Sequence, residues 1–192
     1  MPALGVRLTL RIKAPHLAVR SLFAEATPQG ATLCCKHLEK GFEMADLQAA
    51  AKRVARFREV MAQRGYDAVV LRHNPDLRWL TDAERVFDFE QAHTAFITQD
   101  GLFMHTDSRY YNTFLERLGA DSPWKFDQEV ATPTEWVAAH IAEARARVVA
   151  IEDTVDLAFF DGLEQALRDR SVAALLPRMH GDIAELRIVK DP

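Results

Sequence analysis

The sequence has little of several features that would assign a function directly. Its only two cysteines, Cys34 and Cys35, are adjacent. That spacing suits neither a disulfide nor a zinc site, and it favours a reducing compartment, which we take to be the cytoplasm. No apolar run approaches the roughly 20 residues that span a bilayer, so we expect no membrane partner. The net charge of −4 gives no electrostatic reason to expect nucleic acid as a partner.

Local catalytic and binding motifs are also lacking. The eight glycines form neither G-x-G-x-x-G nor a P-loop, and the serines never form G-x-S-x-G. No two of the seven histidines are close enough for a motif such as H-x-x-x-H. We therefore expect no catalytic residue, no metal site and no cofactor within this chain, and we interpret each histidine as a packed or surface residue.

The first 43 residues differ in character from the rest. Residues 1–24 contain four basic and no acidic residues, a composition that targeting presequences share. Because a recognisable domain pattern starts only after Met44, we favour a poorly ordered extension or an upstream start codon for residues 1–43. Alternating apolar residues over 6–12 also allow a strand there.

The next part of the chain predicts a helix, a buried strand and a strand hairpin. Apolar residues at helical spacing predict a helix from about Asp46 to Arg64, with Asp46 as its N-cap and Gly65 just beyond its end. A buried strand follows over 66–71. Two further strands, 93–98 and 102–106, flank a turn in which Gly101 can supply a positive φ.

The later part continues the alternation. A helix is expected after Asp107 and before Gly119. A second helix begins at Thr132, where Glu135 completes a capping box. Strands are expected over 124–126, 148–152 and 172–176, with a helix around 160–167 between the last two. The pattern predicts an α/β fold in three layers, with a roughly six-stranded mixed sheet and helices on both faces, since the hairpin prevents a wholly parallel sheet.

Four segments, taken in order, resemble the N-terminal domain of the creatinase/Xaa-Pro aminopeptidase/prolidase family. They are the helix, Gly and DAVVL run ending at 71, the NPDLRWLT segment over 74–81, the TDSRY corner over 106–110, and the LRIVK segment over 186–190. The positions that match the family motifs are Asn74, Trp79, Asp107, Arg109, Tyr110, Arg187 and Lys190. The second segment is similar to Asn-x-x-Tyr-Leu-Thr-Gly, with one extra residue, Trp79 in place of Tyr and Asp82 in place of Gly. These departures affect the expected backbone course of the 74–81 loop more than they affect the expected fold. The alternative for the TDSRY corner is local: Asp107 caps a helix and Arg109 is a surface residue.

The resemblance implies that residues 44–192 form a non-catalytic N-terminal domain that ends at the linker to a catalytic domain. Family enzymes bind two divalent metals, Mn, Co or Zn, through two Asp, one His and two Glu of that second domain. None of these ligands maps onto this chain, so we expect the chain alone to be inactive. The implied partners are a second copy in a homodimer, the chain's own catalytic domain and a small peptide or amide substrate.

In this family the N-terminal domain covers the active site, often that of the neighbouring subunit, and helps to select substrates. The loop that would do so here is 82–91, with Arg85, Phe87 and Phe89 as candidate substrate-contacting residues. The alternative is an ordinary charged surface loop with both phenylalanines in the core. We favour the core for each phenylalanine and leave both interpretations of Arg85 open.

A second hypothesis needs no enzyme. The chain could be a free-standing α/β binding or dimerisation module, and the coding sequence after Pro192 would distinguish the two. Within the first hypothesis the sequence does not decide among aminopeptidase P, prolidase, creatinase and their relatives.

Overall fold

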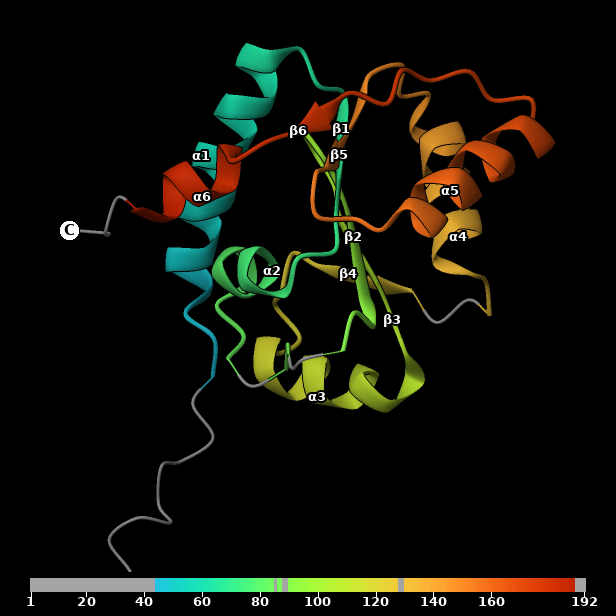
Figure 1. Ribbon diagram of the computed structural model, residues 1–192. Helices are drawn as coiled ribbons and strands as arrows, with labels where there is room; N and C mark the ends of the chain where they lie inside the picture. Colours follow the sequence, from blue (N-terminus) through green and yellow to red (C-terminus); the bar gives the residue numbers. More distant parts are fainter. Residues whose placement is uncertain (1–43, 85, 88–89, 128–129, 189–192) are drawn as a thin grey trace, which may run out of the picture. The chain divides into compact units, whose positions relative to one another are not determined.

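The computed structural model describes residues 44–188, apart from residues 85, 88–89 and 128–129. Helices and strands alternate along this part of the chain (Figure 1). In order, they are α1 (Leu47–Arg64), β1 (Ala68–Leu71), α2 (Asn74–Thr81), β2 (His93–Thr98), β3 (Leu102–Thr106), α3 (Ser108–Leu118), β4 (Lys125–Asp127), α4 (Pro133–Ala144), β5 (Val149–Glu152), α5 (Leu157–Asp169), β6 (Arg178–Met179) and α6 (Asp182–Ile188). The strand suggested over residues 6–12 lies outside the described residues.

The six strands form one mixed sheet in the order β4-β3-β2-β1-β5-β6. Strand β2 is antiparallel to both β1 and β3, whereas β3–β4, β1–β5 and β5–β6 are parallel pairs. In the centre of the sheet, Val70 is opposite Phe96 on one side and Ile151 on the other. The predicted α/β fold with a mixed sheet is confirmed.

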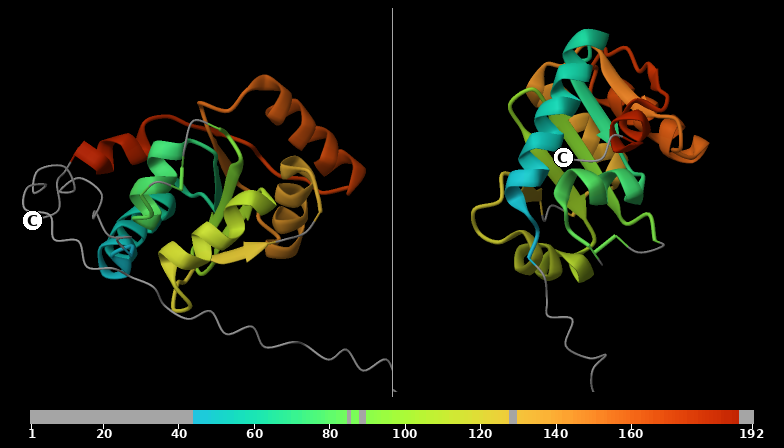
Figure 2. Two further views of the ribbon diagram at one scale, coloured as in Figure 1. Left: turned by 90° about the horizontal axis from the view of Figure 1, so that it is seen from below. Right: turned by 90° about the vertical axis from the view of Figure 1, so that its left-hand side faces the viewer.

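Helices cover both faces of the sheet because neighbouring residues of each strand point to opposite faces. Val69 and Leu71 pack with the apolar sides of α1, α2, α3 and α6, while Val70 and Ile151 pack with those of α4 and α5. Helices α1, α2 and α6 lie on one side of the sheet, and α4 and α5 on the other, in Figure 1 and in the left view of Figure 2. The prediction of three layers is therefore confirmed. No helix in the described part is long and apolar enough to cross a membrane.

Two predicted helix ends are confirmed. The Asp46 carboxylate accepts hydrogen bonds from the Gln48 and Ala49 amides at 3.0 Å each, and Gly65 follows α1 with a left-handed φ of 72°. The capping box at the start of α4 is present, with Glu135 accepting from both the hydroxyl and the amide of Thr132. These bonds, that of the hydroxyl first, lower the pKa of Glu135.

The segment 74–81 is a helix rather than the loop that we expected. Pro75 lies in its first turn, where a proline is tolerated. Asp82 ends α2 with a φ of 56°, which explains why glycine suits this position in the related motif. Its carboxylate accepts from the Asp46 amide at 2.8 Å and from Arg53 at 2.7 Å. These bonds offset the strain of a non-glycine residue in the left-handed region.

The hairpin at Gly101 forms for a different reason from the one we expected. The glycines of the described part with positive φ are Gly65, Gly119 and Gly181, so Gly101 does not use that freedom. A Cβ at Gly101 would instead lie 2.3 Å from Cε2 of Phe103. The Thr98 hydroxyl accepts from the Gly101 amide at 2.8 Å and closes the turn. Space, rather than backbone conformation, favours glycine here.

The last strand lies later than predicted. Residue Leu175 forms only an isolated bridge with Val148, and β6 is formed by Arg178 and Met179. The carbonyl groups of Leu175, Pro177 and Met179 accept from β5 and the residue after it at 2.9–3.1 Å. Pro177 joins this ladder through its carbonyl alone, since a proline has no N–H to donate, and the paired residues of β6 are those after it rather than the apolar run before it.

Asp67 closes the amino-terminal end of the β1–β5 pair. Its Oδ2 accepts from the Arg147 and Val148 amides at 2.8 and 2.9 Å. We expect Asp67→Ala to lower the free energy of unfolding by about 1–2 kcal/mol, because two charge-assisted bonds are lost at an accessible site. Urea unfolding measures this change. Glu116→Ala, an exposed change on α3, is the control and should stay within about 0.5 kcal/mol. Equal stability of the two variants would contradict the role of Asp67.

Candidate functional site

The candidate site is the α2–β2 loop, residues 82–92. Side chains from α2 and from the end of β1 hold the backbone of this loop. The bonds join Asn74 Nδ2 to the Glu90 oxygen (3.0 Å), Arg78 Nη2 to the Phe87 oxygen (2.7 Å) and Arg72 Nη2 to the Gln91 oxygen (3.1 Å). The Arg72 side chain, which holds the end of the loop, is partly buried: its guanidinium lies 4.4 Å from the centre of the Phe159 ring. This burial lowers the pKa of Arg72.

The first turn of α3 holds the loop from the other side. Arg109 Nη2 lies 2.9 Å from Oε2 of Glu90, and the Tyr110 hydroxyl lies 3.5 Å from the same oxygen. Asp107 caps α3 by accepting from the Arg109 amide at 2.9 Å, and it also accepts from Arg109 Nε at 3.0 Å. The TDSRY corner therefore caps a helix, as the local alternative had it, and its Arg109 also contacts the α2–β2 loop, which the sequence did not predict.

The charges of this corner are mutually stabilised. The Arg109 amide and then its side chain lower the pKa of the Asp107 carboxyl by donating hydrogen bonds to it. Asp107 and then Glu90 raise the pKa of Arg109 further above its usual value. Because these groups lie at the surface, we assign them to the positioning of the loop rather than to a large share of the stability.

Phe87 is a core residue of this domain. Its side chain is 1% exposed, and its ring makes edge contacts with His93 at 5.1 Å and with Phe114 at 5.3 Å between ring centres. A ring held in this way is not available to contact a substrate, so its place among the substrate-contacting candidates is corrected in favour of the core alternative. Arg85 and Phe89 lie outside the described residues.

His93 is a central residue that the sequence analysis did not single out. It is fully buried at the start of β2, its Nδ1 lies 2.8 Å from the Thr106 hydroxyl, and its ring contacts Tyr110 at 4.8 Å. It thereby connects the loop, the hairpin and α3. A histidine at the start of an apolar run carries no local signal of such a role.

Two other family-motif positions have structural roles. The Arg53 guanidinium lies 5.9 Å from the centre of the Trp79 ring, and Arg53 Nη1 donates to the Trp79 backbone carbonyl at 3.1 Å. Trp79 thus contributes to the contact between α1 and α2. Arg187 Nη1 pairs with Asp76 at 2.8 Å and ties α6 to α2. Lys190 lies outside the described residues. Among the residues that the structure describes, no three His, Cys, Asp or Glu side chains form a group that could hold a metal ion.

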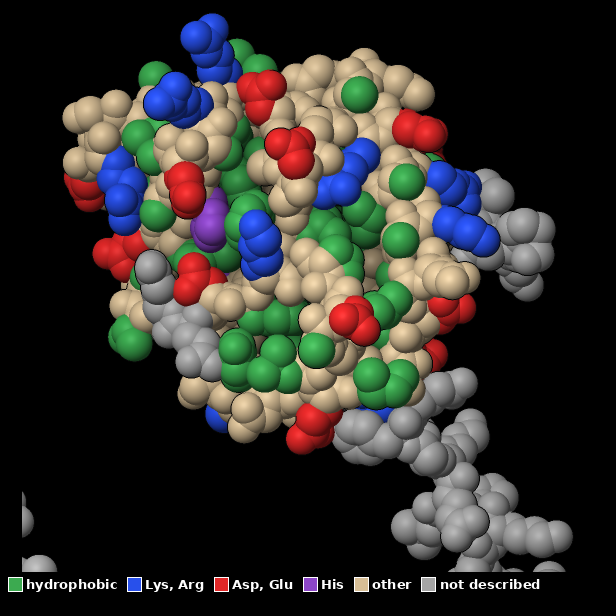
Figure 3. All heavy atoms as spheres, turned by 180° about the vertical axis from the view of Figure 1, so that it is seen from behind, with side chains coloured by type: hydrophobic (Ala, Val, Ile, Leu, Met, Phe, Trp, Pro, Cys, Tyr) green, Lys and Arg blue, Asp and Glu red, His purple; other side chains and the backbone are tan. Residues whose placement is uncertain are grey.

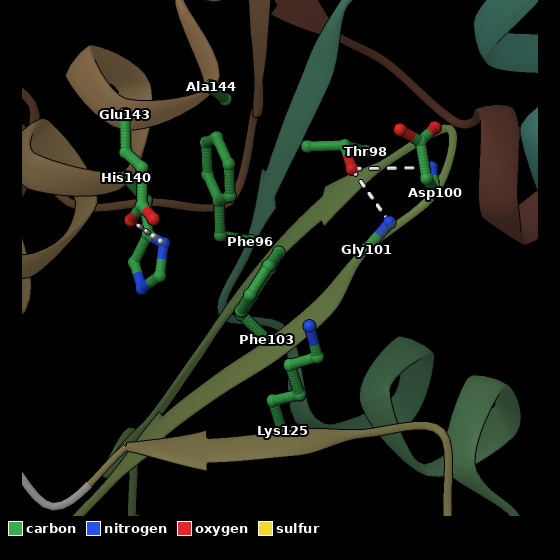
Figure 4. Close-up of a pocket in the computed structure, with 9 residues that line it drawn as sticks. All are labelled: Phe96, Thr98, Asp100, Gly101, Phe103, Lys125, His140, Glu143 and Ala144. Carbon is green, nitrogen blue, oxygen red and sulfur yellow. Dashed lines mark hydrogen bonds and ion pairs between the residues drawn. The ribbon is translucent and has the colours of Figure 1, made fainter.

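Apart from the α2–β2 loop, a hollow lies on the face of the sheet that α4 covers. It has a volume of about 240 Å³ and lies between α4, the hairpin turn and β4 (Figure 4). The His140 ring stacks on Phe96 at 5.5 Å and lies 4.7 Å from Phe103, and Lys125 Nζ lies 5.2 Å from the Phe103 ring centre. Figure 3, seen from behind, shows hydrophobic side chains and a histidine at the surface among charged groups. The charged residues of this hollow, Asp100, Lys125 and Glu143, are all exposed, so it is a weaker site than the loop.

Comparison with known proteins identifies the family. The model of the creatinase/prolidase N-terminal domain matches residues 53–189. The chain belongs to this family. No curated protein matches it.

Solved structures of related domains share the fold. Aminopeptidase P (Xaa-Pro aminopeptidase) from Streptococcus thermophilus has a TM-score of 0.60 at 20% identity over 72% of this chain and 98% of that chain. The N-terminal domain of the cytoplasmic peptidase PepQ from Mycobacterium tuberculosis has a TM-score of 0.58 at 20% identity, over 71% and 98%. The Xaa-Pro dipeptidase from Bacillus anthracis has a TM-score of 0.61 at 18% identity over 74% of this chain, which spans only 37% of that chain.

The burial of Phe87 makes a direct prediction. Phe87→Ala should lower the free energy of unfolding by about 3–5 kcal/mol, since it leaves a cavity between His93 and Phe114. Leu115→Ala on α3 is the control: because Leu115 is 43% exposed, this variant should lose far less free energy of unfolding than Phe87→Ala. Chemical denaturation measures both. A Phe87→Ala variant as stable as the parent would place the ring outside the core and restore it as a substrate-contacting candidate.

Proposed function

We propose that this chain is the non-catalytic N-terminal domain of an Xaa-Pro peptidase-like metallohydrolase. In this proposal its α2–β2 loop covers the active site of a catalytic domain and takes part in substrate selection. The observation that carries the proposal is the pair of clamps on this loop, from Asn74 and Arg78 on one side and from Arg109 on the other. Family membership supports it independently.

The clamps matter because ordering a loop costs free energy when a ligand binds. A loop whose backbone is already held at Phe87, Glu90 and Gln91 loses less conformational freedom on contact with a substrate than a free loop of the same length. Three of the side chains that hold it, Asn74, Arg109 and Tyr110, are family-motif positions. This role explains why polar side chains occur at those positions on a surface that faces the loop.

The chemistry would belong to the other domain. Two divalent metals, Mn, Co or Zn, would activate a bridging water there, and the substrate would be a small peptide or amide. We further propose a cytoplasmic homodimer in which the loop reaches the active site of the partner subunit. The present chain would supply shape and charge to that site, but neither metal ligands nor a nucleophile.

The coding sequence beyond residue 192 tests the proposal. A continuation that carries two Asp, one His and two Glu in a second domain would support it. A stop codon directly after residue 192 would instead favour the free-standing α/β binding or dimerisation module, and the proposed enzyme would be abandoned.

The loop's role can be measured in the whole enzyme through Arg85. Arg85→Ala should lower kcat/KM for a Pro-containing dipeptide by roughly tenfold or more, because one charge-assisted hydrogen bond to an anionic group is worth about 1.5–3 kcal/mol. The melting temperature should stay within a few degrees, since surface changes are usually worth less than about 0.5 kcal/mol.

The matched control is Arg170→Ala, at an exposed arginine just after α5 on the other face of the sheet. Its kcat/KM should equal that of the parent. Unchanged kinetics for Arg85→Ala would make Arg85 an ordinary surface residue, and a large drop in melting temperature would make it part of the fold.

A further inference from the structure

The sheet has an open edge at β6. This strand is the last in the sheet order, and no described strand lies beyond it. The carbonyl groups of Leu175, Pro177 and Met179 all accept from β5 or the residue after it, so this segment is extended. Because backbone groups of successive residues in an extended chain point to alternate sides, those of Ala174, Leu176 and Arg178 point away from β5.

This edge lacks the protection that exposed sheet edges usually have. Native edges are commonly blunted by lysines or by a proline that removes an outward-facing donor. Pro177 bonds β5 through its carbonyl, so its missing N–H lies on the β5 side and the outward-facing residues all keep their N–H groups. Leu175, beside them, is 69% exposed. The edge is therefore suited to pair with a further strand.

An apolar hollow lies beside this edge, on the face of the sheet that α5 covers. It has a volume of about 730 Å³, and its apolar lining includes Phe160, Leu167, Val172 and Leu176. The guanidinium of Arg178 lies 4.1 Å from the centre of the Phe160 ring, on the same face. The edge and the hollow thus form one surface that offers backbone hydrogen bonds and apolar side chains together.

We propose that this edge pairs with the same edge of a second copy of the chain, antiparallel, about a two-fold axis at Leu176. In that register Leu176 lies opposite Leu176 of the second copy, and Ala174 lies opposite Arg178. The two residues of each such pair exchange both of their N–H and C=O hydrogen bonds, so about six backbone bonds join the two copies. The two sheets then become one continuous sheet.

The occupant is a second copy because the segment complements itself in this register. Pro177 lies opposite Leu175 of the second copy, at a position where no N–H is needed, and it covers that exposed side chain. Like charges are kept apart, since Arg178 faces Ala174 and the two arginines lie four positions, roughly 13 Å, from each other along the strands. Self-complementarity of one patch is what a two-fold interface requires.

The hollow supplies the contact area that a short strand pair lacks. Specific interfaces bury about 1,200–2,000 Å², which is more than a few paired residues provide. A two-fold axis perpendicular to the joined sheet places the hollows of both copies on the same face, on either side of the paired Leu176 residues. The apolar side chains of both hollows, including Phe160 and Leu176, then border one shared surface.

The test uses the whole 192-residue chain and no enzymatic assay, so its outcome is separate from that of the proposed function. Sedimentation equilibrium from low micromolar to nearly millimolar protein should show monomers converting to dimers. Over the same range, hydrogen exchange of the Ala174, Leu176 and Arg178 amides should slow by at least roughly tenfold. The Leu175 amide, which already donates to the Arg147 carbonyl at 2.7 Å, should slow less.

Two variants locate the dimer on this edge. Leu175→Lys places a charge against Pro177 of the second copy and should raise the dissociation constant at least roughly tenfold, since an edge lysine opposes strand pairing. Ala174→Pro removes an outward-facing donor and should act in the same direction. The matched control is Leu157→Lys, at a leucine of α5 that is 73% exposed and lies outside the hollow, and it should dimerise like the parent.

Circular dichroism and the melting temperature check that each variant is folded, and Leu175→Lys decides the test if Ala174→Pro is not. A parent chain that stays monomeric would overturn the inference. This includes a monomer whose three outward amides are already protected, because another segment of the chain then covers the edge. A dimer that Leu175→Lys leaves as tight as the parent would also overturn it, because the copies then meet at another surface.

Discussion

The fold depends on one long-range contact, the parallel pairing of β1 with β5. A carboxylate closes each end of this pair: Asp67 accepts from the amides that precede β5, and Glu152 accepts from the Arg72 amide that follows β1. Arg72 and Glu152 are 80 residues apart, so forming the pair carries a large loop-closure cost. Burial of both strands in the two apolar layers offsets that cost, and the two carboxylates set the register.

The chain diverges after this pair, into α2 from β1 and into α5 from β5. On one face the chain continues into α2 and then the α2–β2 loop, which Arg72, Arg78 and Arg109 hold in place. At the carboxyl ends of these strands lies a pocket that Glu152 helps to line. Arg72 belongs to both, since its amide bonds Glu152 and its guanidinium bonds the end of the loop.

Local signals in the sequence predicted the local features of the fold, and features set by distant contacts were missed. The Asp46 cap and the Thr132 capping box need only neighbouring residues, so the sequence sufficed. The helix ending at Asp82 and the position of β6 were not predicted, because a distant amide and the β5 ladder decide them. The candidate site divides in the same way.

For the site, the Asp107 cap could be predicted, but the meeting of Arg109 with Glu90 could not, since 19 residues separate them. The central claim is that the α2–β2 loop covers a catalytic site, and a crystal structure of the whole enzyme with a Pro-containing product bound tests it most directly. The account predicts that a side chain from residues 82–91, of the same or the partner subunit, contacts that product. A structure in which this loop faces solvent, with another segment covering the product, would contradict the account.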